Sequence, residues 1–298
     1  MSATTASTWL PGTRAVVACI LSVVLPGSGS FYLGRLRTAL VALGFATLGS
    51  VAAGLLWRAG VIGAAPLVVA IALCTLVGHA GGALLAAIEA WQGRTKRAFV
   101  PSLGFMLLAA SSLFAMRRLS QLWIMATYAV ATIAMEPGLQ HGDRVLVVPH
   151  APEYAYPRGS IVALRDPSSG ENFVRRLIAV GGDGVRIHDS EVLVNGHSLR
   201  QGPCDDSALM PCFVERSLDG LEYVVVERLA DGGMDLQVTV PEGSVFVMRD
   251  RRDLSLPLDP MSREWLTGEV WDVWWSYTHQ GVRLERLGLP ARPRPASP

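Results

Sequence analysis

Lysine is almost absent from this sequence, because Lys96 is the only one among 298 residues although the chain carries 26 basic residues. Arginine therefore supplies nearly all of the positive charge. A guanidinium does not deprotonate in proteins, whereas a desolvated lysine amine does. Chemistry that needs a neutral lysine amine is therefore excluded from residues 131–298.

Acidic residues are scarce in the first part of the chain. Residues 1–130 hold nine Lys and Arg but a single acid, Glu89, and so carry a net charge of +8. Residues 131–298 hold 17 Arg and 24 acids and carry −7, so the overall charge of +1 hides two unlike halves. The hydrophobic residues, half of the total, are concentrated before Met135. This asymmetry excludes a single soluble domain.

Motifs for nucleotides and metals are also missing. The glycine-rich stretch GGDG at 181–184 separates two predicted strands and does not open a helix, so it is not a phosphate loop. No zinc-ligand spacing is present. We therefore expect no cofactor, no metal ion and no nucleic-acid partner.

Long apolar segments fill the first half. A bilayer core of about 30 Å needs about 20 apolar residues per helix, and four candidates occur, at residues 15–32, 39–56, 61–88 and 99–116. We predict a multi-pass membrane region of about four helices over residues 1–130. A fifth span over 119–134 remains open, and it would reverse the side assigned to every earlier loop. The stretch LPGSGSFYLGR at 25–35 contains three glycines, which favours a helix break or a close helix approach over a binding site.

The second half reads as short strands. Runs that alternate or are rich in β-branched residues are separated by Gly, Pro, Asp or Asn. They lie at residues 145–148, 160–164, 173–180, 185–187, 191–194, 223–228, 236–240, 245–248 and 270–277. This pattern predicts a mainly-β domain over residues 131–288, a β-sandwich or partly open barrel. Residues 289–298 are Pro-rich, and we expect a disordered tail there.

Two cysteines close a short loop in the second half. Cys204 and Cys212 lie within PCDDSALMPC. They indicate a disulfide, which needs an oxidising compartment outside the cytoplasm; two unpaired buried thiols are the alternative. Cys19 and Cys74 lie in apolar segments and are expected to be small hydrophobic residues.

The junction of the two halves, ATIAMEPGLQHGDRVLVV at 131–148, resembles a motif of signal peptidase I, S-x-S-M-x-P-T-L-x-x-G-D-x-V. Members of that family are membrane-bound serine endopeptidases. Further segments resemble the family in the same order: NFVRRLIAVGGDGV at 172–185, VFVMRDRRDLS at 245–255, and the closing strands at 265–287. The resemblance covers about residues 120–288. It implies a signal-peptidase-type β domain, a Ser nucleophile and a Lys general base.

The residues at the matched catalytic positions depart from the family pattern. Ala134 occupies the nucleophile position, and Arg175, or Arg176 with a slip of one residue, occupies the base position. Thr132 matches the first Ser of S-x-S and is either a hydroxyl donor to an oxyanion or a turn cap. Ser255 matches the Ser that orients the base.

Other positions near the matched site also differ. Arg249 and Arg251 stand where Gly and Asn are expected. His141 is the nearest histidine in sequence to position 134, and we expect it to be a surface turn residue.

Two functions follow from the resemblance. The first is a catalytically impaired or inactive membrane homologue whose β domain, on the outer face of the cell membrane and periplasmic in a two-membrane bacterium, binds signal-peptide-like segments. The alternative is an active signal peptidase I that removes signal peptides from exported precursor proteins. Whether the chain is an enzyme stays open at this stage. In a third, weaker interpretation the membrane half carries the function. The expected partners are signal-peptide segments or exported precursors, together with the lipid bilayer.

Overall fold

The structure is a computed structural model of the whole chain. It describes residues 11–33, 35–59, 61–62, 64–92, 105–107, 109–111, 113–115, 118, 124–151, 153–188, 191–204, 211–227, 235–252, 259–291 and 294–295. The chain divides into two compact units, Met1–Ile124 and Met125–Pro298. We describe each unit by itself.

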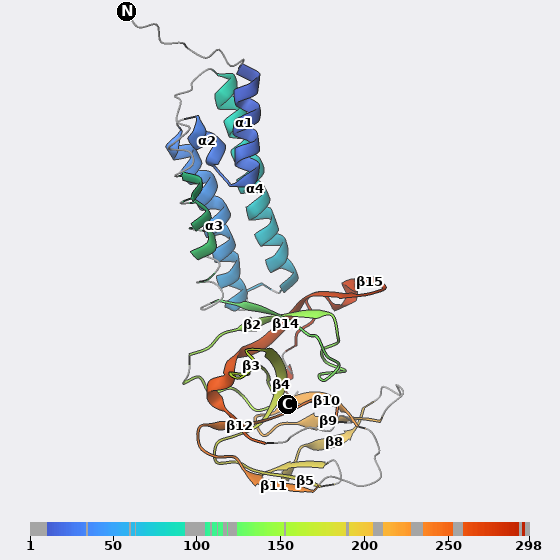
Figure 1. Cartoon of the computed structure of the whole chain (residues 1–298). Helices are drawn as coiled ribbons and strands as arrows, with labels where there is room; N and C mark the ends of the chain where they lie inside the picture. The colour runs from blue at the N-terminus through green and yellow to red at the C-terminus, as the bar shows by residue number, and fades with distance from the viewer. Residues whose placement is uncertain are drawn as a thin grey trace, which may run out of the picture. The chain divides into compact units, whose positions relative to one another are not determined.

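The first unit is helical. Its elements are α1 (Pro11–Val24), α2 (Ser28–Tyr32), α3 (Leu36–Arg58) and α4 (Ala64–Trp91). Within the described residues, two helices are long and apolar enough to cross a membrane, at Leu36–Arg58 and Val69–Ile88, with mean hydropathies of 2.0 and 1.9. α4 packs against both α1 and α3, as can be followed in Figure 1. In the predicted fourth span, the described residues 105–107, 109–111 and 113–115 are helical.

The expectation that residues 15–32 form one continuous span is wrong. α1 ends at Val24, and the chain turns at Gly27, whose φ of 83° lies in the left-handed region that glycine tolerates. α2 then packs against α1, because the amide of Gly29 donates to Ser22 Oγ at 3.0 Å. A Cβ on Gly29 would lie 1.9 Å from the carbonyl oxygen of Ala18. The glycines of this stretch therefore permit both the break and the close approach that their pattern indicated.

A fifth membrane span over residues 119–134 is excluded by strand pairing. Residues 126–129 form strand β1 (Ala126–Ala129), which pairs antiparallel with the strand that begins at Asp143. The register aligns Ala126 with Val147 and Ala129 with Arg144. A helix cannot run through residues whose backbone groups bond to a sheet.

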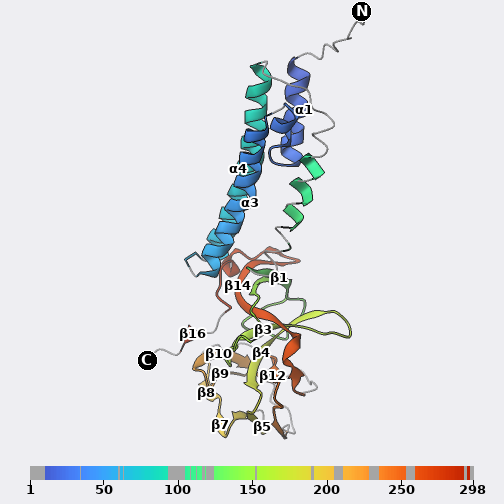
Figure 2. The same ribbon diagram turned by 90° about the vertical axis from the view of Figure 1, so that its left-hand side faces the viewer.

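The second unit is mainly β, as the sequence predicts (Figure 2). Every predicted run overlaps a strand. After β1, its strands are β2 (Asp143–Val148), β3 (Ile161–Arg165), β4 (Asn172–Val180), β5 (Gly184–His188), β6 (Glu191–Val194), β7 (His197–Ser198), β8 (Arg200–Pro203), β9 (Cys212–Arg216), β10 (Leu221–Val226), β11 (Leu236–Thr239), β12 (Ser244–Met248), β13 (Met261–Ser262), β14 (Leu266–Thr278), β15 (Gly281–Val282) and β16 (Arg294–Pro295).

One large sheet and two small sheets make up this unit. The large sheet has the order β1-β2-β14-β3-β4-β12-β13, with β15 attached to β14. The small sheets have the orders β16-β10-β9-β8 and β11-β5-β6-β7. β4 is buried on both faces because its residues contribute to different core clusters: Val174 packs with Met135 and Leu139, whereas Leu177 packs with Tyr156. This two-sided burial holds β4 and its neighbours rigidly in place.

The segment 289–298, expected to be disordered, makes backbone hydrogen bonds where it is described. The amide of Ala291 donates to the carbonyl oxygen of Trp271 at 2.8 Å. β16 pairs with β10, aligning Leu221 with Pro295.

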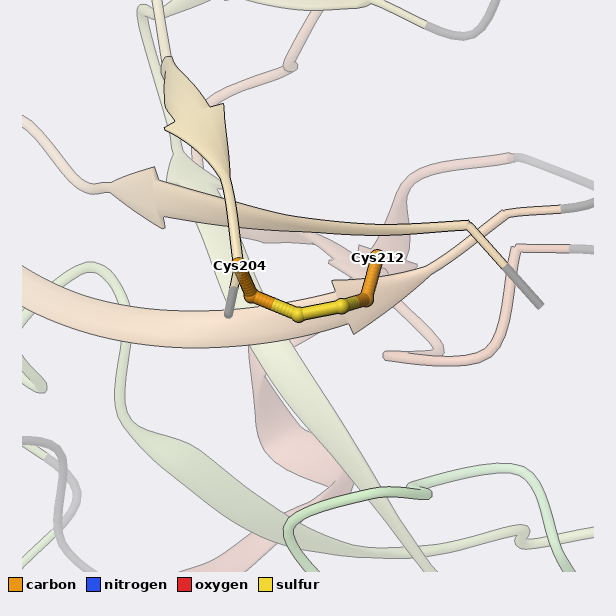
Figure 3. Close-up of a disulfide and its surroundings, with 2 residues drawn as sticks. All are labelled: Cys204 and Cys212. Carbon is orange, nitrogen blue, oxygen red and sulfur yellow. A yellow bond between two sulfur atoms is a disulfide. The ribbon is translucent and has the colours of Figure 1, made fainter. Parts of the chain in front are cut away.

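Cys204 and Cys212 form a disulfide between the end of β8 and the start of β9, with Cα atoms 5.5 Å apart (Figure 3). β8 and β9 are paired antiparallel beside it. Cys19 and Cys74 are free.

Replacing Cys204 and Cys212 together by Ala is expected to lower the free energy of unfolding by about 2–3 kcal/mol, because the bond closes a short loop of the unfolded chain. Urea unfolding in detergent, followed by tryptophan fluorescence, measures the change. Cys19→Ala with Cys74→Ala is the matched control. A protein with four titratable thiols after denaturation without reductant would contradict the bond.

Candidate functional site

A turn between β1 and β2 carries residue 134. Met135 and Leu139 anchor it, since both side chains are fully buried and the amide of Leu139 donates to the carbonyl oxygen of Met135 at 2.9 Å. The Glu136–Pro137 peptide bond within the turn is cis. Ala134 is itself buried, and its methyl group offers no heteroatom. The turn therefore holds position 134 firmly but supplies no nucleophile there.

Thr132 lies at the exposed start of this turn. Its hydroxyl oxygen accepts a long hydrogen bond from the amide of Ala134, at 3.4 Å. This contact is the local capping typical of Thr in turns. The described geometry thus favours the turn-cap interpretation of Thr132 over oxyanion stabilisation.

The two arginines of β4 have different surroundings. Arg176 is buried, and its guanidinium donates to both carboxylate oxygens of Asp250, at 2.6 and 2.5 Å, and to the carbonyl oxygen of Gly159. It also lies over the ring of Tyr223, 4.0 Å from the centroid. Burial lowers the pKa of Arg176, but Asp250 more than offsets this effect, so the pKa is raised. Arg176 is therefore held as a structural cation, and the assignment of Arg175 to the base position stays a prediction.

Arg175 is half-buried and differently bonded. Its Nη1 donates to the carbonyl oxygen of Val174 at 2.7 Å, and its guanidinium lies 5.1 Å from the ring centroid of Phe173. Burial, and second the positive charge of Arg249, lower the pKa of Arg175 to about 10. Only about one molecule in a thousand is then neutral at pH 7. Arg175 remains a cation at working pH and cannot serve as a general base.

Backbone contacts bring three of the matched segments together. The amide of Arg251 donates to the carbonyl oxygen of Ala134 at 3.1 Å. In the ladder between β12 and β4, Met248 is paired with Arg176. The turn at 134, the β4 arginines and the residues after β12 are therefore neighbours, although they are far apart in sequence. Ser255 lies outside the described residues.

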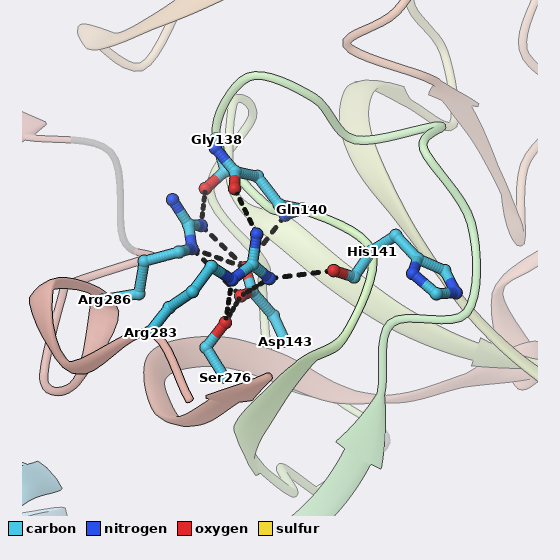
Figure 4. A network of polar contacts seen from close by, with 7 residues as sticks. All are labelled: Gly138, Gln140, His141, Asp143, Ser276, Arg283 and Arg286. Atoms are coloured by element: carbon cyan, nitrogen blue, oxygen red, sulfur yellow. Dashed lines mark hydrogen bonds and ion pairs between the residues drawn. The ribbon is translucent and has the colours of Figure 1, made fainter. Parts of the chain in front are cut away.

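A buried aspartate ties the turn to the end of the chain (Figure 4). Asp143 accepts hydrogen bonds from Ser276 Oγ at 2.6 Å, from Arg286 Nη2 at 2.6 Å and from the amide of Gln140 at 2.8 Å. Arg283 pairs with the same carboxylate at 3.2 Å. Burial raises the pKa of Asp143, but these hydrogen bonds outweigh it, so the pKa lies below its ordinary value.

His141 contributes only its main chain to this network, because its carbonyl oxygen accepts from Arg283 Nη2 at 2.8 Å. Its ring points away from the network in Figure 4, and the residue is exposed. This placement matches the expected surface turn residue.

Asp143→Asn is expected to destabilise the protein by about 3 kcal/mol at pH 7, because Arg286 loses its buried counter-charge. A folded-state pKa that is depressed contributes stability above the unfolded pKa, and that stability is lost as pH falls through the folded value. The difference between the variant and the unaltered protein should therefore shrink below about pH 4. Thermal melts at pH 7 and pH 3 measure it. Asp259→Asn, at an exposed position, is the control, and a gap that widens in acid would contradict the network's role.

A cavity of about 480 Å³ adjoins the turn. Its lining includes Pro137, Gly138, Ile161, Arg176 and Tyr223, with Val214, Glu222, Val224, Pro290 and Ala291 completing the wall. Arg175 is not among the described lining residues. In the described part of the chain, no group of three His, Cys, Asp or Glu side chains could hold a metal ion.

Sequence reasoning identified Ala134 and Arg175 but missed the ion pairs around them. The Arg176–Asp250 pair and the Asp143–Arg286 pair both join residues more than 70 positions apart. The sequence did contain one indication, because Arg176 and Asp250 are charged residues that lie next to matched positions. Which residue each of them pairs with depends on strand register and cannot be seen in a single sequence.

Comparisons with known proteins match the same part of the chain. The family model described as "Signal peptidase, peptidase S26" matches residues 99–268. Signal peptidase I of Bacillus licheniformis is 30% identical over 132 residues, which cover 43% of this chain and 63% of that protein. Signal peptidase I U of Bacillus subtilis (strain 168) is 30% identical over 125 residues, covering 41% and 59%. The chain therefore matches less than two thirds of the length of these relatives.

A solved signal peptidase I from Enterococcus faecalis V583 is also similar, at 21% identity and a TM-score of 0.26, covering 39% of this chain and 97% of that one. The family assignment depends on the family model, which spans more than half of the 298 residues and includes the turn at 134, both arginines of β4 and the segment after β12. The chain belongs to the signal peptidase family, peptidase S26.

Proposed function

We propose that this protein is a signal peptidase homologue without Ser–Lys peptidase activity that holds signal-peptide-like segments at the outer face of a membrane. The observation that carries the proposal is the pair of residues at the catalytic positions. Ala134 sits in a turn anchored by the buried Met135 and Leu139, and Arg175 stays cationic at pH 7. At these two positions, neither attack on a carbonyl carbon nor removal of a proton has a group to perform it.

Binding does not need the missing groups. β1 ends the path of the large sheet, and within the described strands it pairs with β2 alone. An edge strand offers unpaired amide and carbonyl groups to which an extended peptide can add. Because β1 leads directly into the turn, a peptide added there would run toward position 134.

The location of the β unit follows from its chemistry. The disulfide between Cys204 and Cys212 persists only in an oxidising compartment. Two helices of the first unit are long and apolar enough to anchor the chain in a bilayer. We infer that the β unit lies outside the cytoplasm of a membrane-anchored protein, where signal peptides of exported precursors emerge.

The purified full-length protein in detergent is expected to bind a precursor whose signal peptide ends in Ala-x-Ala and to leave it uncleaved. Gel electrophoresis after long incubation tests cleavage, and fluorescence polarisation of the labelled precursor tests binding. A related active signal peptidase, run in parallel, shows that the substrate is competent. Cleavage by this protein, lost on Thr132→Val or His141→Ala, would reveal a substitute site and support the alternative of an active peptidase.

A further inference from the structure

Residues 289–291 and 294–295, which we call the tail segment, are attached to the β unit as an added strand. The amide of Ala291 donates to the carbonyl oxygen of Trp271 in β14 at 2.8 Å. Further along the chain, β16 pairs with β10. The tail segment therefore connects the large sheet to one of the small sheets.

The tail segment lies along a part of β14 that β3 does not cover. β3 pairs with β14 between Leu266 and Glu269, and β2 pairs with the opposite edge of β14. Beyond Glu269, the amide of Val273 donates to the carbonyl oxygen of Leu289 at 3.0 Å, so the tail segment continues the sheet on the side of β3. In strand addition, backbone hydrogen bonds supply affinity and side-chain pockets supply specificity. This edge therefore accepts an extended chain, and the protein's own tail segment is its present occupant.

The cavity of about 480 Å³ beside the turn at 134 adjoins the tail segment, because Ala291 forms part of its wall. Apolar residues of β3, β9 and β10 also line it: Ile161, Val214 and Val224. The side chain of Ala291 is a single methyl group, so room remains beside it for a larger apolar side chain. A peptide with such a side chain at this position would bury apolar area that the tail segment leaves unburied.

The tail segment is attached with little burial. Leu289 and Pro290 are exposed, and Ala291 is half-buried against the core cluster that contains Met135 and Leu139. Pro290 also has no backbone amide to donate. Segments with few buried apolar contacts open locally at a much smaller cost in free energy than global unfolding. The tail segment is therefore a strand that another extended peptide can displace.

We propose that the edges of β14 and β10 beside this cavity bind an extended peptide that carries an apolar side chain larger than that of Ala, and that the tail segment closes the site until such a peptide displaces it. In the order of the large sheet, β2 separates β14 from β1. The site is therefore distinct from the β1 edge, and it does not depend on the proposed function.

Three labelled peptides that differ at one position test this proposal. The first, LGLPARPRP, copies residues 287–295, and the second has Leu at the position of Ala291. The full-length protein in detergent is expected to bind the Leu peptide at least about tenfold more tightly, as measured by fluorescence polarisation, because Leu buries more apolar area. The third peptide has Pro at this position and should bind more weakly than the first, because it lacks the amide that donates to Trp271.

Variants of the full-length protein locate the site. Ala291→Pro removes the same amide from the tail segment, and it should therefore tighten the binding of the Leu peptide by about threefold. Leu289→Gln is the matched control, because it changes the neighbouring exposed side chain and keeps the backbone bonds. The control should bind the Leu peptide as the unaltered protein does.

Hydrogen exchange in the unaltered protein shows whether the tail segment leaves. Saturating Leu peptide should speed the exchange of the Ala291 amide. It should not change the exchange of the Leu177 amide in β4, which donates to the carbonyl oxygen of Ser160. This measurement needs no variant, so it stands even if a variant fails to fold.

The outcomes separate this site from the proposed function. Peptide binding without faster exchange at Ala291 overturns the site, and so does equal affinity for the Leu and Ala peptides. Binding of none of the three peptides, with an intact precursor still bound, overturns the site and leaves peptide holding at β1 intact.

Discussion

The full-length protein carrying Ala134→Ser together with Arg175→Lys is expected to cleave a precursor ending in Ala-x-Ala slowly, whereas neither single variant cleaves it. Ser alone has no base to take its proton, because Arg175 remains a cation. Lys alone has no hydroxyl to activate. The effects of replacing two residues that act as one unit are strongly non-additive in this way.

The local environment favours the introduced lysine as a base. Burial and the charge of Arg249 bring the pKa of Arg175 to about 10. The same surroundings would also lower the pKa of a lysine at this position, because burial and a nearby positive charge both disfavour the charged amine. A lowered pKa increases the fraction of neutral amine near pH 7, as general-base catalysis requires. The cleavage rate should therefore rise between pH 7 and pH 9.

Arg249 also limits the rate of the double variant. In the matched segment it stands where the family has Gly, and a side chain at that position takes up room that Gly leaves open. We expect Arg249→Gly, added to the double variant, to raise the cleavage rate. It should also shift the pH optimum upward, because it removes a positive charge that lowers the pKa of the introduced lysine. Gel electrophoresis at several pH values measures both effects. Equal cleavage by the Ala134→Ser single variant and the double variant would contradict the assignment of Arg175 to the base position.

Asp250→Ala is expected to destabilise the protein by about 3–5 kcal/mol, which is a large share of the stability of a typical domain. The change leaves the Arg176 guanidinium buried without its counter-charge, and only 3% of that residue is exposed. The free energy of a buried charge is unfavourable unless the charge is paired. Urea unfolding, followed by tryptophan fluorescence, measures the loss.

A surface pair provides the control for this second prediction. Glu222 pairs with Arg216, and both side chains are at least a third exposed. Glu222→Ala should cost no more than about 1 kcal/mol, because water screens the pair. Replacing Arg176 and Asp250 together by Met and Leu should restore most of the stability lost in Asp250→Ala. An Asp250→Ala variant no less stable than Glu222→Ala would mean that Arg176 finds another partner.

Local sequence patterns were enough to predict much of the fold. Alternation along a strand is a property of neighbouring residues, so β4 and β14 could be predicted from the sequence alone. The apolar stretch before position 131 reads equally well as helix or strand. Pairing of Ala126 with Val147 decided that β1 is a strand.

The amino-acid sequence by itself determined the unlike halves of this protein, the strands of its second half and the family resemblance, and it predicts that Ala134 and Arg175 occupy the nucleophile and base positions. These follow from residue identity and short-range spacing. Only the tertiary structure decided that the span at 15–32 breaks, that Arg176 is paired with Asp250, and that Met248 of β12 is aligned with Arg176 of β4. Such contacts depend on strand register and on burial, which bring together side chains more than 70 residues apart.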